Sequence, residues 1–193
     1  TLKEWVDESW KAQAEWREQA EDDFAFVDGH QWSDTEEADL RANSRLPIVF
    51  NRTATILASV AGSEINNRTE VRFIPRVSGG GKPNEVLSAG AEWFRDQSAA
   101  EDADSEAFQN LLVCGVGVTD TGLDFEEDPE GAPTIESLDP VSVGWDCYAR
   151  GKGLKDARYV FEVKDMPLEE AKERFSEHDP TEINASWIKT SAA

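Results

Sequence analysis

The chain has 193 residues, 39% of them hydrophobic and 31% charged, a composition that predicts one globular domain with a sizeable core. Its 40 acidic and 19 basic residues give a formal net charge of −21, which argues against an ordinary DNA-binding domain because affinity for phosphates depends on basic side chains. No apolar run approaches the roughly 20 residues that cross a bilayer, and no secretory signal pattern opens the sequence. Two cysteines fit a reducing compartment, with Cys114 as a core residue, so we expect a protein made in cytoplasm and not placed in a membrane.

The first thirty residues predict a helix that ends at Gly29, because a glycine commonly follows the last helical turn. The apolar positions of this helix fall near one stripe at helical spacing: Leu2, Val6, Trp16, Ala20, Phe24 and Val27. The next stretch, SDTEEADLRANS, predicts a short helix with Ser33 or Asp34 as its N-cap.

The segment RLPIVFNR, residues 45–52, combines a proline with four apolar residues between two arginines. Pro47 disfavours helical geometry at Leu46, so the segment is expected to be extended. Asn51 is a plausible cap for a helix that runs to about Asn66.

The alternating sequence TEVRFIPRV predicts a strand that ends at Pro75. The following SGGGKP predicts a flexible loop, and it lacks the GK[ST] of a phosphate-binding loop. Two helices are expected next, over Asn84–Ser98 and Ala100–Val113. The acidic EDADSE lacks the glycine and the final glutamate of a calcium loop, and it is interpreted as the solvated start of the second helix.

From residue 115 the pattern changes to strands. GVGVTDTGLDF, the turn EEDPEGAP and TIESLDP predict an antiparallel hairpin, and VSVGWDCYA and DARYVFEVKD add extended segments. PLEEAKERF predicts a final helix with Pro167 in its first turn. The predicted fold class is α+β, in one domain over residues 1–193: mainly helical with one strand over 1–114, strand-rich with a closing helix over 115–175, and a tail over 176–193.

No catalytic constellation is evident in the sequence. His30 and His178 lie far apart without partners at metal-ligand spacing, and neither a GxSxG nor an HExxH motif occurs. An alternative is a two-metal nuclease built from carboxylates at the predicted strand ends, namely Asp120, Asp124, Asp139 and Asp146. Because aspartate is also a common turn former, we expect no catalytic residue, no metal and no cofactor.

Several short segments occur here in a characteristic order: FVDGHQW, RLPIVFNR, VAGSEINNRTEVRFIPR, AFQNLLVCGVGV and ESLDPVSVGWDCYARGKGLKDARYVF. In this order they resemble the amino-terminal part of portal proteins from short-tailed, double-stranded DNA bacteriophages. The residues that carry the resemblance are Gly29, Gln31, Trp32, Pro47, Asn51, Asn67, Pro75, Asp139, Pro140, Trp145 and Asp146. No single motif is specific, but their joint order covers nearly the whole chain.

The resemblance implies a structural subunit of a ring, usually of twelve copies, at one vertex of the capsid. DNA is packaged, retained and ejected through such a ring without sequence-specific binding. The implied location is the virion, with assembly in the host cytoplasm. The implied partners are further copies of the chain, the capsid protein and, through parts absent from this sequence, the terminase and the tail adaptor.

In such a ring this chain would form the outer wing domain. Residues 45–52 would connect two helices, with their apolar side chains tucked under the following helix and Trp32 largely buried as an anchor. Arg45, Arg52 and Arg68 are candidates for contacts across a subunit boundary, although local surface salt bridges would equally explain the first two.

Members of the family are several times longer than this chain, so it is expected to be part of a longer polypeptide. Besides the nuclease, the alternative is a stand-alone acidic protein that mimics DNA. A mimic would present carboxylates at phosphate-like spacing on one face, and it would not need seven tryptophans.

Overall fold

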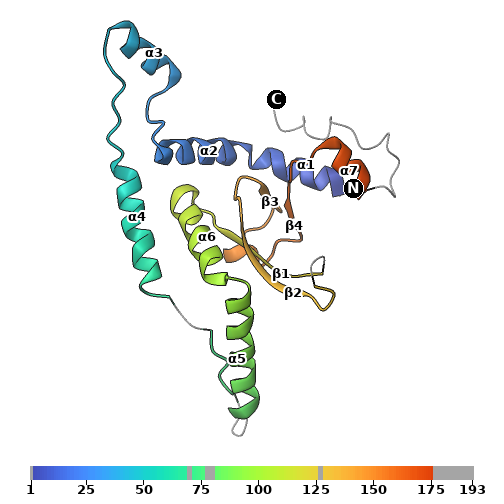
Figure 1. Cartoon of the computed structure of the whole chain (residues 1–193). Helices are drawn as coiled ribbons and strands as arrows, with labels where there is room; N and C mark the ends of the chain where they lie inside the picture. Colours follow the sequence, from blue (N-terminus) through green and yellow to red (C-terminus); the bar gives the residue numbers. More distant parts are fainter. Residues whose placement is uncertain (1, 69–70, 77–80, 126–127, 176–193) are drawn as a thin grey trace. The chain divides into compact units, whose positions relative to one another are not determined.

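The computed structural model describes residues 2–68, 71–76, 81–125 and 128–175. Helices dominate the first part of the chain and strands follow, which confirms the α+β class (Figure 1). The described residues divide into two compact units. We refer to residues 20–140 as the central unit and to residues 1–19 together with 141–193 as the terminal unit, and we describe each by itself.

The first helical region is divided at Gln13 into α1 (Leu2–Ala12) and α2 (Ala14–Asp28). Gly29 has a φ of +105°, a backbone conformation that side chains with a Cβ rarely adopt, and it ends α2 as predicted. The predicted apolar stripe is wrong at its start, because Leu2 is exposed. The face that is buried carries polar residues at a spacing of four: Ser9, Gln13 and Arg17.

The central unit continues with α3 (Asp34–Ala42) and α4 (Arg52–Ile65), and both begin with the predicted caps. The Ser33 hydroxyl accepts the Glu36 N–H, while the Glu36 carboxylate accepts the Ser33 N–H, which is a complete capping box. The Asn51 side-chain oxygen accepts the N–H of Ala54 at 3.0 Å. Two further helices, α5 (Gly81–Gln97) and α6 (Ala100–Cys114), are joined at Ala99, which has a left-handed φ of 48°.

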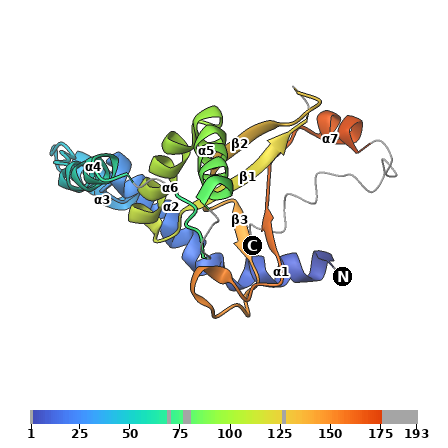
Figure 2. The same ribbon diagram turned by 90° about the horizontal axis from the view of Figure 1, so that it is seen from below.

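The hairpin of the central unit consists of β1 (Val118–Asp124) and β2 (Ala132–Leu138), paired antiparallel from Val118–Leu138 to Asp124–Ala132. Helices α5 and α6 lie against this hairpin (Figure 2). The buried face of α6 is made of small residues: Ala100, Ala103, Ser105, Ala107 and Cys114. A Cβ at Gly117 would collide with the carbonyl oxygen of Ala107, so glycine is needed where the chain leaves α6 for β1.

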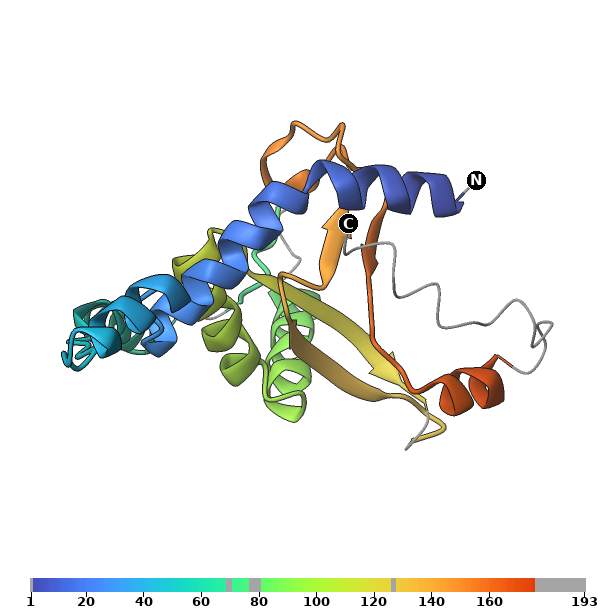
Figure 3. The same cartoon turned by 90° about the horizontal axis from the view of Figure 1, so that it is seen from above.

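The terminal unit pairs β3 (Val143–Trp145) with β4 (Val160–Glu162) in antiparallel register, and α1 lies beside them (Figure 3). Aromatic rings join the helices to the strands: Trp16 meets Trp145 edge-on at 5.4 Å between ring centroids, and Trp5 stacks on Tyr159 at 5.5 Å. The chain then forms a short 3-10 helix (Lys152–Leu154) before β4 and α7 (Leu168–Arg174) after it. Pro167 caps α7, close to its predicted place.

The buried polar side chains of α1 and its junction with α2 bind the same two strands. The hydroxyls of Ser9 and Tyr159 are 2.9 Å apart, and the Gln13 amide donates to the carbonyl oxygen of Trp145 at 2.8 Å. Arg17 stacks on the ring of Trp10, with its guanidinium carbon 3.4 Å from the ring centroid. The amphipathic pattern therefore places hydrogen-bonding groups, rather than a continuous apolar stripe, against β3 and β4.

The predicted strand over TEVRFIPRV is wrong for its described residues, 71–76, which are not part of a sheet. Apolar alternation predicts which side chains share a face, but a strand also requires a neighbouring strand, and β1 and β2 pair with each other. The segment is instead held on α5, where the Phe73 N–H donates to the Ser88 hydroxyl at 2.9 Å.

Candidate functional site

The Gly-x-Gln-Trp motif and Asn51 meet where α2 ends and α4 begins. The Asn51 amide donates to the carbonyl oxygen of Val27 at 2.5 Å, and its oxygen accepts from the Gln31 amide at 3.4 Å as well as capping α4. Gln31 also donates to the carbonyl oxygen of Phe26 at 3.4 Å. We call this arrangement the clasp: it ties two helix ends together and gives the Val27 carbonyl, in the last turn of α2, a hydrogen-bond donor.

Trp32 follows the clasp, and its expected burial is wrong. Its side chain is 41% exposed, although its indole N–H donates to the carbonyl oxygen of Ile48 at 3.4 Å. Trp32 therefore fixes the path of the following segment by a hydrogen bond. It does not anchor a core, because α3 and residues 45–51 do not enclose the ring.

The connector, which we define as residues 45–51, exposes three of its four apolar side chains, while Val49 is half-buried. Leu46 is 80% exposed, Ile48 59% and Phe50 80%, so the expectation that they tuck under α4 is wrong. Two γ-turns, with the Ile48 N–H donating to the Leu46 carbonyl and the Arg52 N–H donating to the Phe50 carbonyl, make the segment shorter than a fully extended chain. These turns centre on Pro47 and Asn51.

Arg45 and Arg52 stand at the two ends of this apolar segment. Within the described residues neither side chain is in an ion pair, so the local salt bridges considered for them do not occur there. An exposed apolar segment between two unpaired cations is a surface that contact with another molecule would complete. A role for Arg45 and Arg52 at a subunit boundary stays a prediction.

Arg68, the third candidate, is engaged within its own chain. Its guanidinium pairs with Glu101, donates to the Ser105 hydroxyl at 2.9 Å and lies 3.9 Å from Glu64. Ser105 in turn donates to Glu64 at 2.9 Å. This network holds the end of α4 on the start of α6, which gives Arg68 a structural role in the central unit.

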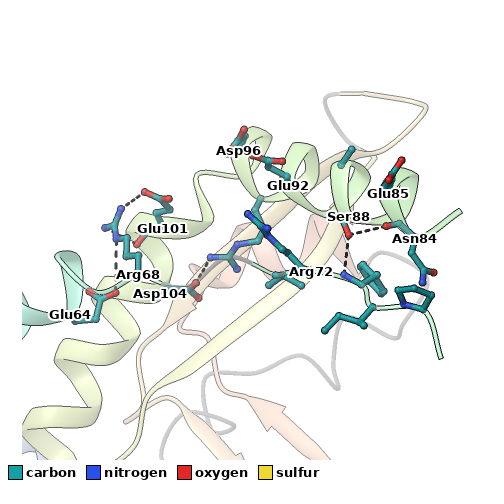
Figure 4. Close-up of a pocket in the computed structure, with 16 residues that line it drawn as sticks. Glu64, Arg68, Arg72, Asn84, Glu85, Ser88, Glu92, Asp96, Glu101 and Asp104 are labelled. Atoms are coloured by element: carbon teal, nitrogen blue, oxygen red, sulfur yellow. Dashed lines mark hydrogen bonds and ion pairs between the residues drawn. The ribbon is translucent and has the colours of Figure 1, made fainter. Parts of the chain in front are cut away.

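A groove of about 940 Å³ lies beside this network (Figure 4). One wall is α5, another is the segment 71–75, and the first turns of α6 close one end. The Ser88 hydroxyl holds the two walls together, since it accepts from Phe73 and donates to the carbonyl oxygen of Asn84 at 2.8 Å. Apolar, carboxylate and arginine side chains line it together. The carboxylates are Glu64, Glu85, Glu92, Asp96, Glu101 and Asp104, and the arginines are Arg68, Arg72 and Arg95.

Part of the negative charge in the groove is neutralised by arginines of the same unit. Arg95 pairs with Asp104 at 2.6 Å, and Arg68 with Glu101. The carboxylates of Glu85, Glu92 and Asp96 have no ion-pair partner among the described residues, and all three side chains are exposed. Figure 4 shows them along α5. With six carboxylates and three arginines in its lining, the groove combines apolar surface with a net negative charge.

The Trp-Asp and Asp-Ala-Arg motifs meet in the terminal unit. The buried Asp146 carboxylate accepts two hydrogen bonds from the Arg158 guanidinium, at 2.6 and 3.1 Å, and the N–H of Tyr148 at 3.0 Å. The Arg158 hydrogen bonds hold the pKa of Asp146 well below its ordinary value, and the same pairing raises the pKa of Arg158. Asp156 accepts the N–H groups of Arg150 and Gly151, both at 2.8 Å, which lowers its pKa as well.

The sequence interpretation missed Arg158 as the partner of Asp146. The register of β3 and β4 explains this ion pair: Trp145 pairs with Val160, which places Asp146 beside the residues that precede β4. We call the Asp146–Arg158 pair, with the main-chain groups that it binds, the lock.

The other motif residues support the two units locally. The Asn67 amide donates to the carbonyl oxygen of Ser63 at 2.7 Å at the end of α4, and Pro75 lines the groove. Asp139 and Pro140 follow β2, and Pro140 is fully buried. Burial raises the pKa of Cys114, as expected for a core thiol.

The described residues offer little to metal chemistry. Among them, no group of three or more His, Cys, Asp or Glu side chains could hold a metal ion. Asp146, which the nuclease alternative requires, is occupied by Arg158. His178 lies outside the described residues. Over the described part of the chain, no helix is long and apolar enough to span a membrane.

The motif order and these contacts agree with a comparison against protein families: the family described as phage P22-like portal protein matches residues 3–192. The chain belongs to this family. The portal protein of Helicobacter pylori bacteriophage KHP30 is 24% identical to it over 125 residues. That similarity covers 65% of this chain but only 21% of the relative, so this portal chain spans about a fifth of the length of the curated relative it matches. Membership of the family confirms the resemblance to phage portal proteins.

Proposed function

We propose that this chain is the outer, wing-type part of a subunit of the portal ring at the unique vertex of a phage capsid. The observation that carries the proposal is the family match over residues 3–192. The ring, expected to have twelve subunits, conducts the genome during packaging, retains it and releases it at ejection. Its partners are further copies of itself and the capsid protein, while terminase and tail adaptor bind through parts of the longer protein outside this chain.

The negative net charge of the chain supports the proposal that the ring is a channel through which DNA passes. Twelve copies at −21 give about −250, and a field of this sign repels a polyanion at short range, so that DNA does not adhere to the subunit surface as it passes. The exposed connector supports assembly, because three large apolar side chains in water favour contact with another protein surface. A stand-alone DNA mimic requires no such segment.

The direct test is electron microscopy of the full-length protein in negative stain, together with native mass spectrometry. Ring-shaped particles with rotational symmetry, and a mass that is a whole multiple of the subunit mass, are the expected result. A full-length protein that stays monomeric at micromolar concentration would contradict the proposal. The 193-residue chain alone is expected to be monomeric or weakly associating, since the rest of the subunit is missing from it.

A second test concerns catalysis. Duplex and single-stranded DNA incubated with the chain and magnesium or manganese are expected to stay intact, because Asp146 is engaged by Arg158. Cleavage that is lost in Asp139→Asn or Asp146→Asn would support the nuclease alternative instead.

A further inference from the structure

Helix α4 separates two segments of the central unit: residues 45–51 precede it and residues 71–76 follow it in the chain (Figure 1). The connector precedes this helix, while the groove lies at its other end, where Glu64 and Arg68 contribute to the lining. We propose that the connector of each subunit docks into the groove of the neighbouring subunit. The proposal rests on the proposed function and deepens it, because it names the two surfaces that meet at each subunit boundary.

Both surfaces carry apolar side chains that the single chain leaves in water. The connector contributes Leu46, Ile48 and Phe50. The groove contributes three exposed residues of the segment beside α5: Val71, Phe73 and Ile74. Contact between the two sets removes apolar area of both from water, and this is the main source of affinity in protein association.

The charges of the two surfaces are complementary. Arg45 and Arg52 bracket the apolar part of the connector, and the described part of the chain holds no ion-pair partner for either. The groove offers the carboxylates of Glu85, Glu92 and Asp96, which are equally unpaired there. Opposite charges on facing surfaces set register and exclude wrong partners.

The spacing of these charges also fits. Arg45 and Arg52 are seven residues apart, at most about 25 Å in a fully extended chain, and the two γ-turns shorten this span. Glu85 and Asp96 are eleven residues apart on α5, about 16 Å at the helical rise. Long arginine side chains cover the remaining difference.

The connector cannot reach the groove of its own chain. It joins α4 directly at Asn51, and the 14 residues of that helix place about 21 Å between the connector and Glu64. The clasp further fixes the connector at the α2 end of α4. A contact between two different surfaces of identical chains is heterologous, and it forms a ring when the rotation between subunits closes.

The test uses two charge-reversal variants of the full-length protein. The connector variant carries Arg45→Glu and Arg52→Glu, and the groove variant carries Glu85→Arg and Glu92→Arg. All four positions are exposed, and a glutamate at the first residue of α4 complements the helix dipole, so both variants are expected to fold. A matched control, Lys152→Glu with Lys155→Glu, changes the net charge as the connector variant does, at exposed positions of the terminal unit.

Each variant alone is expected to form about tenfold fewer rings than wild type in native mass spectrometry, while the control forms them normally. An equimolar mixture of the two variants is expected to restore rings in which they alternate, because each boundary then joins opposite charges. Rings formed by either variant alone at the wild-type level, or no recovery on mixing, would overturn the docking while leaving the proposed function intact. Absence of rings from the wild-type protein would overturn both.

A second measurement does not depend on charge. Ile48→Cys lies midway along the connector and Ala89→Cys lies in the groove, between the two tested glutamates. The double variant is expected to give a ladder of disulfide-linked multimers on oxidation, while each single variant gives no such ladder. A ladder with the same spacing in either single variant, or none in the double variant, would contradict the docking.

Discussion

The connector and the lock are both built from portal-family motifs, and both have arginine beside aromatic or aliphatic residues. They differ in whether the arginine is paired within the chain. In the lock, Arg158 is paired with a buried carboxylate whose remaining acceptor sites bind main-chain N–H groups. At the two ends of the connector, Arg45 and Arg52 have no ion-pair partner among the described residues, and Leu46, Ile48 and Phe50 between them face water. A segment that satisfies its own groups stabilises the chain, and a segment that leaves them unsatisfied is suited to assembly.

The largest expected effect separates assembly from stability in the connector. Leu46→Ser with Phe50→Ser is expected to abolish most ring formation by the full-length protein, because both side chains are 80% exposed in the single chain. The free energy of unfolding of the 193-residue chain is expected to change by no more than about 0.5 kcal/mol, as at other exposed sites. Native mass spectrometry and urea unfolding measure the two quantities. A large loss of stability would show that the connector packs within its own chain.

The lock is expected to behave in the opposite way. Asp146→Asn removes the charge that Arg158 binds, so the melting temperature of the 193-residue chain is expected to fall by several degrees. The pH dependence gives a second readout. Because the folded-state pKa of Asp146 is depressed below the ordinary 3.8, its contribution is present above that pH and is lost as the pH falls through the folded-state pKa.

Thermal unfolding at several pH values checks this sign. The wild-type chain is expected to lose more stability below pH 3.8 than Asp146→Asn does, while Asp156 contributes a similar acid dependence to both. Parallel curves for the two proteins over this range would show that the Asp146–Arg158 pair does not stabilise the fold.

The sequence predicted those features that depend on a few neighbouring residues. Gly29, Ser33 and Asn51 mark helix ends through their own backbone preferences or capping atoms, and the hairpin follows from alternation around a turn. Features that depend on distant partners were not predicted. The segment 71–76 has the alternation of a strand, but it pairs with none of the strands in the described residues and contacts α5 instead.

The same distinction explains the errors at the candidate site. Apolar residues after Pro47 suggested burial under α4, but burial depends on what covers them, and within the single chain nothing described does. Ser9 and Gln13 are buried although they are polar, because β3 and Tyr159 offer them hydrogen-bond partners. Arg158 could be matched to Asp146 only once the pairing of β3 with β4 was known.

A change in stability of intermediate size is expected at the clasp. Its hydrogen bonds are made within the chain, and they also fix the end of the connector next to α4. Asn51→Ala removes the cap of α4 and the bond to the Val27 carbonyl, and is expected to cost about 2 kcal/mol in urea unfolding. Asn51→Asp keeps a capping oxygen and loses only the donor, so it separates the clasp from the cap. If the aspartate variant were as stable as wild type, the bond between the helix ends would contribute nothing.

The smallest effect is expected for Trp32, which stands between the clasp and the connector. Full truncation of a buried tryptophan costs about 3–5 kcal/mol, but this ring is 41% exposed and its indole hydrogen bond is long, at 3.4 Å. Trp32→Ala is therefore expected to cost only about 1 kcal/mol in urea unfolding of the 193-residue chain. Trp32→Phe keeps most of the aromatic ring and loses the N–H, so any further difference in stability between the two variants reports on the contacts of the aromatic ring.

Fluorescence quenching gives a second readout for Trp32. The fluorescence of this residue is obtained as the difference between wild type and Trp32→Phe. It is expected to be quenched by iodide or acrylamide in the single chain and to be protected in the full-length portal ring, where the neighbouring subunit covers the connector. Two results would contradict this: a loss of 3 kcal/mol or more in Trp32→Ala, or an indole that is already shielded from the quencher in the single chain. Either result would show that Trp32, like the residues of the lock, is buried and bonded within its own chain, unlike the exposed residues of the connector.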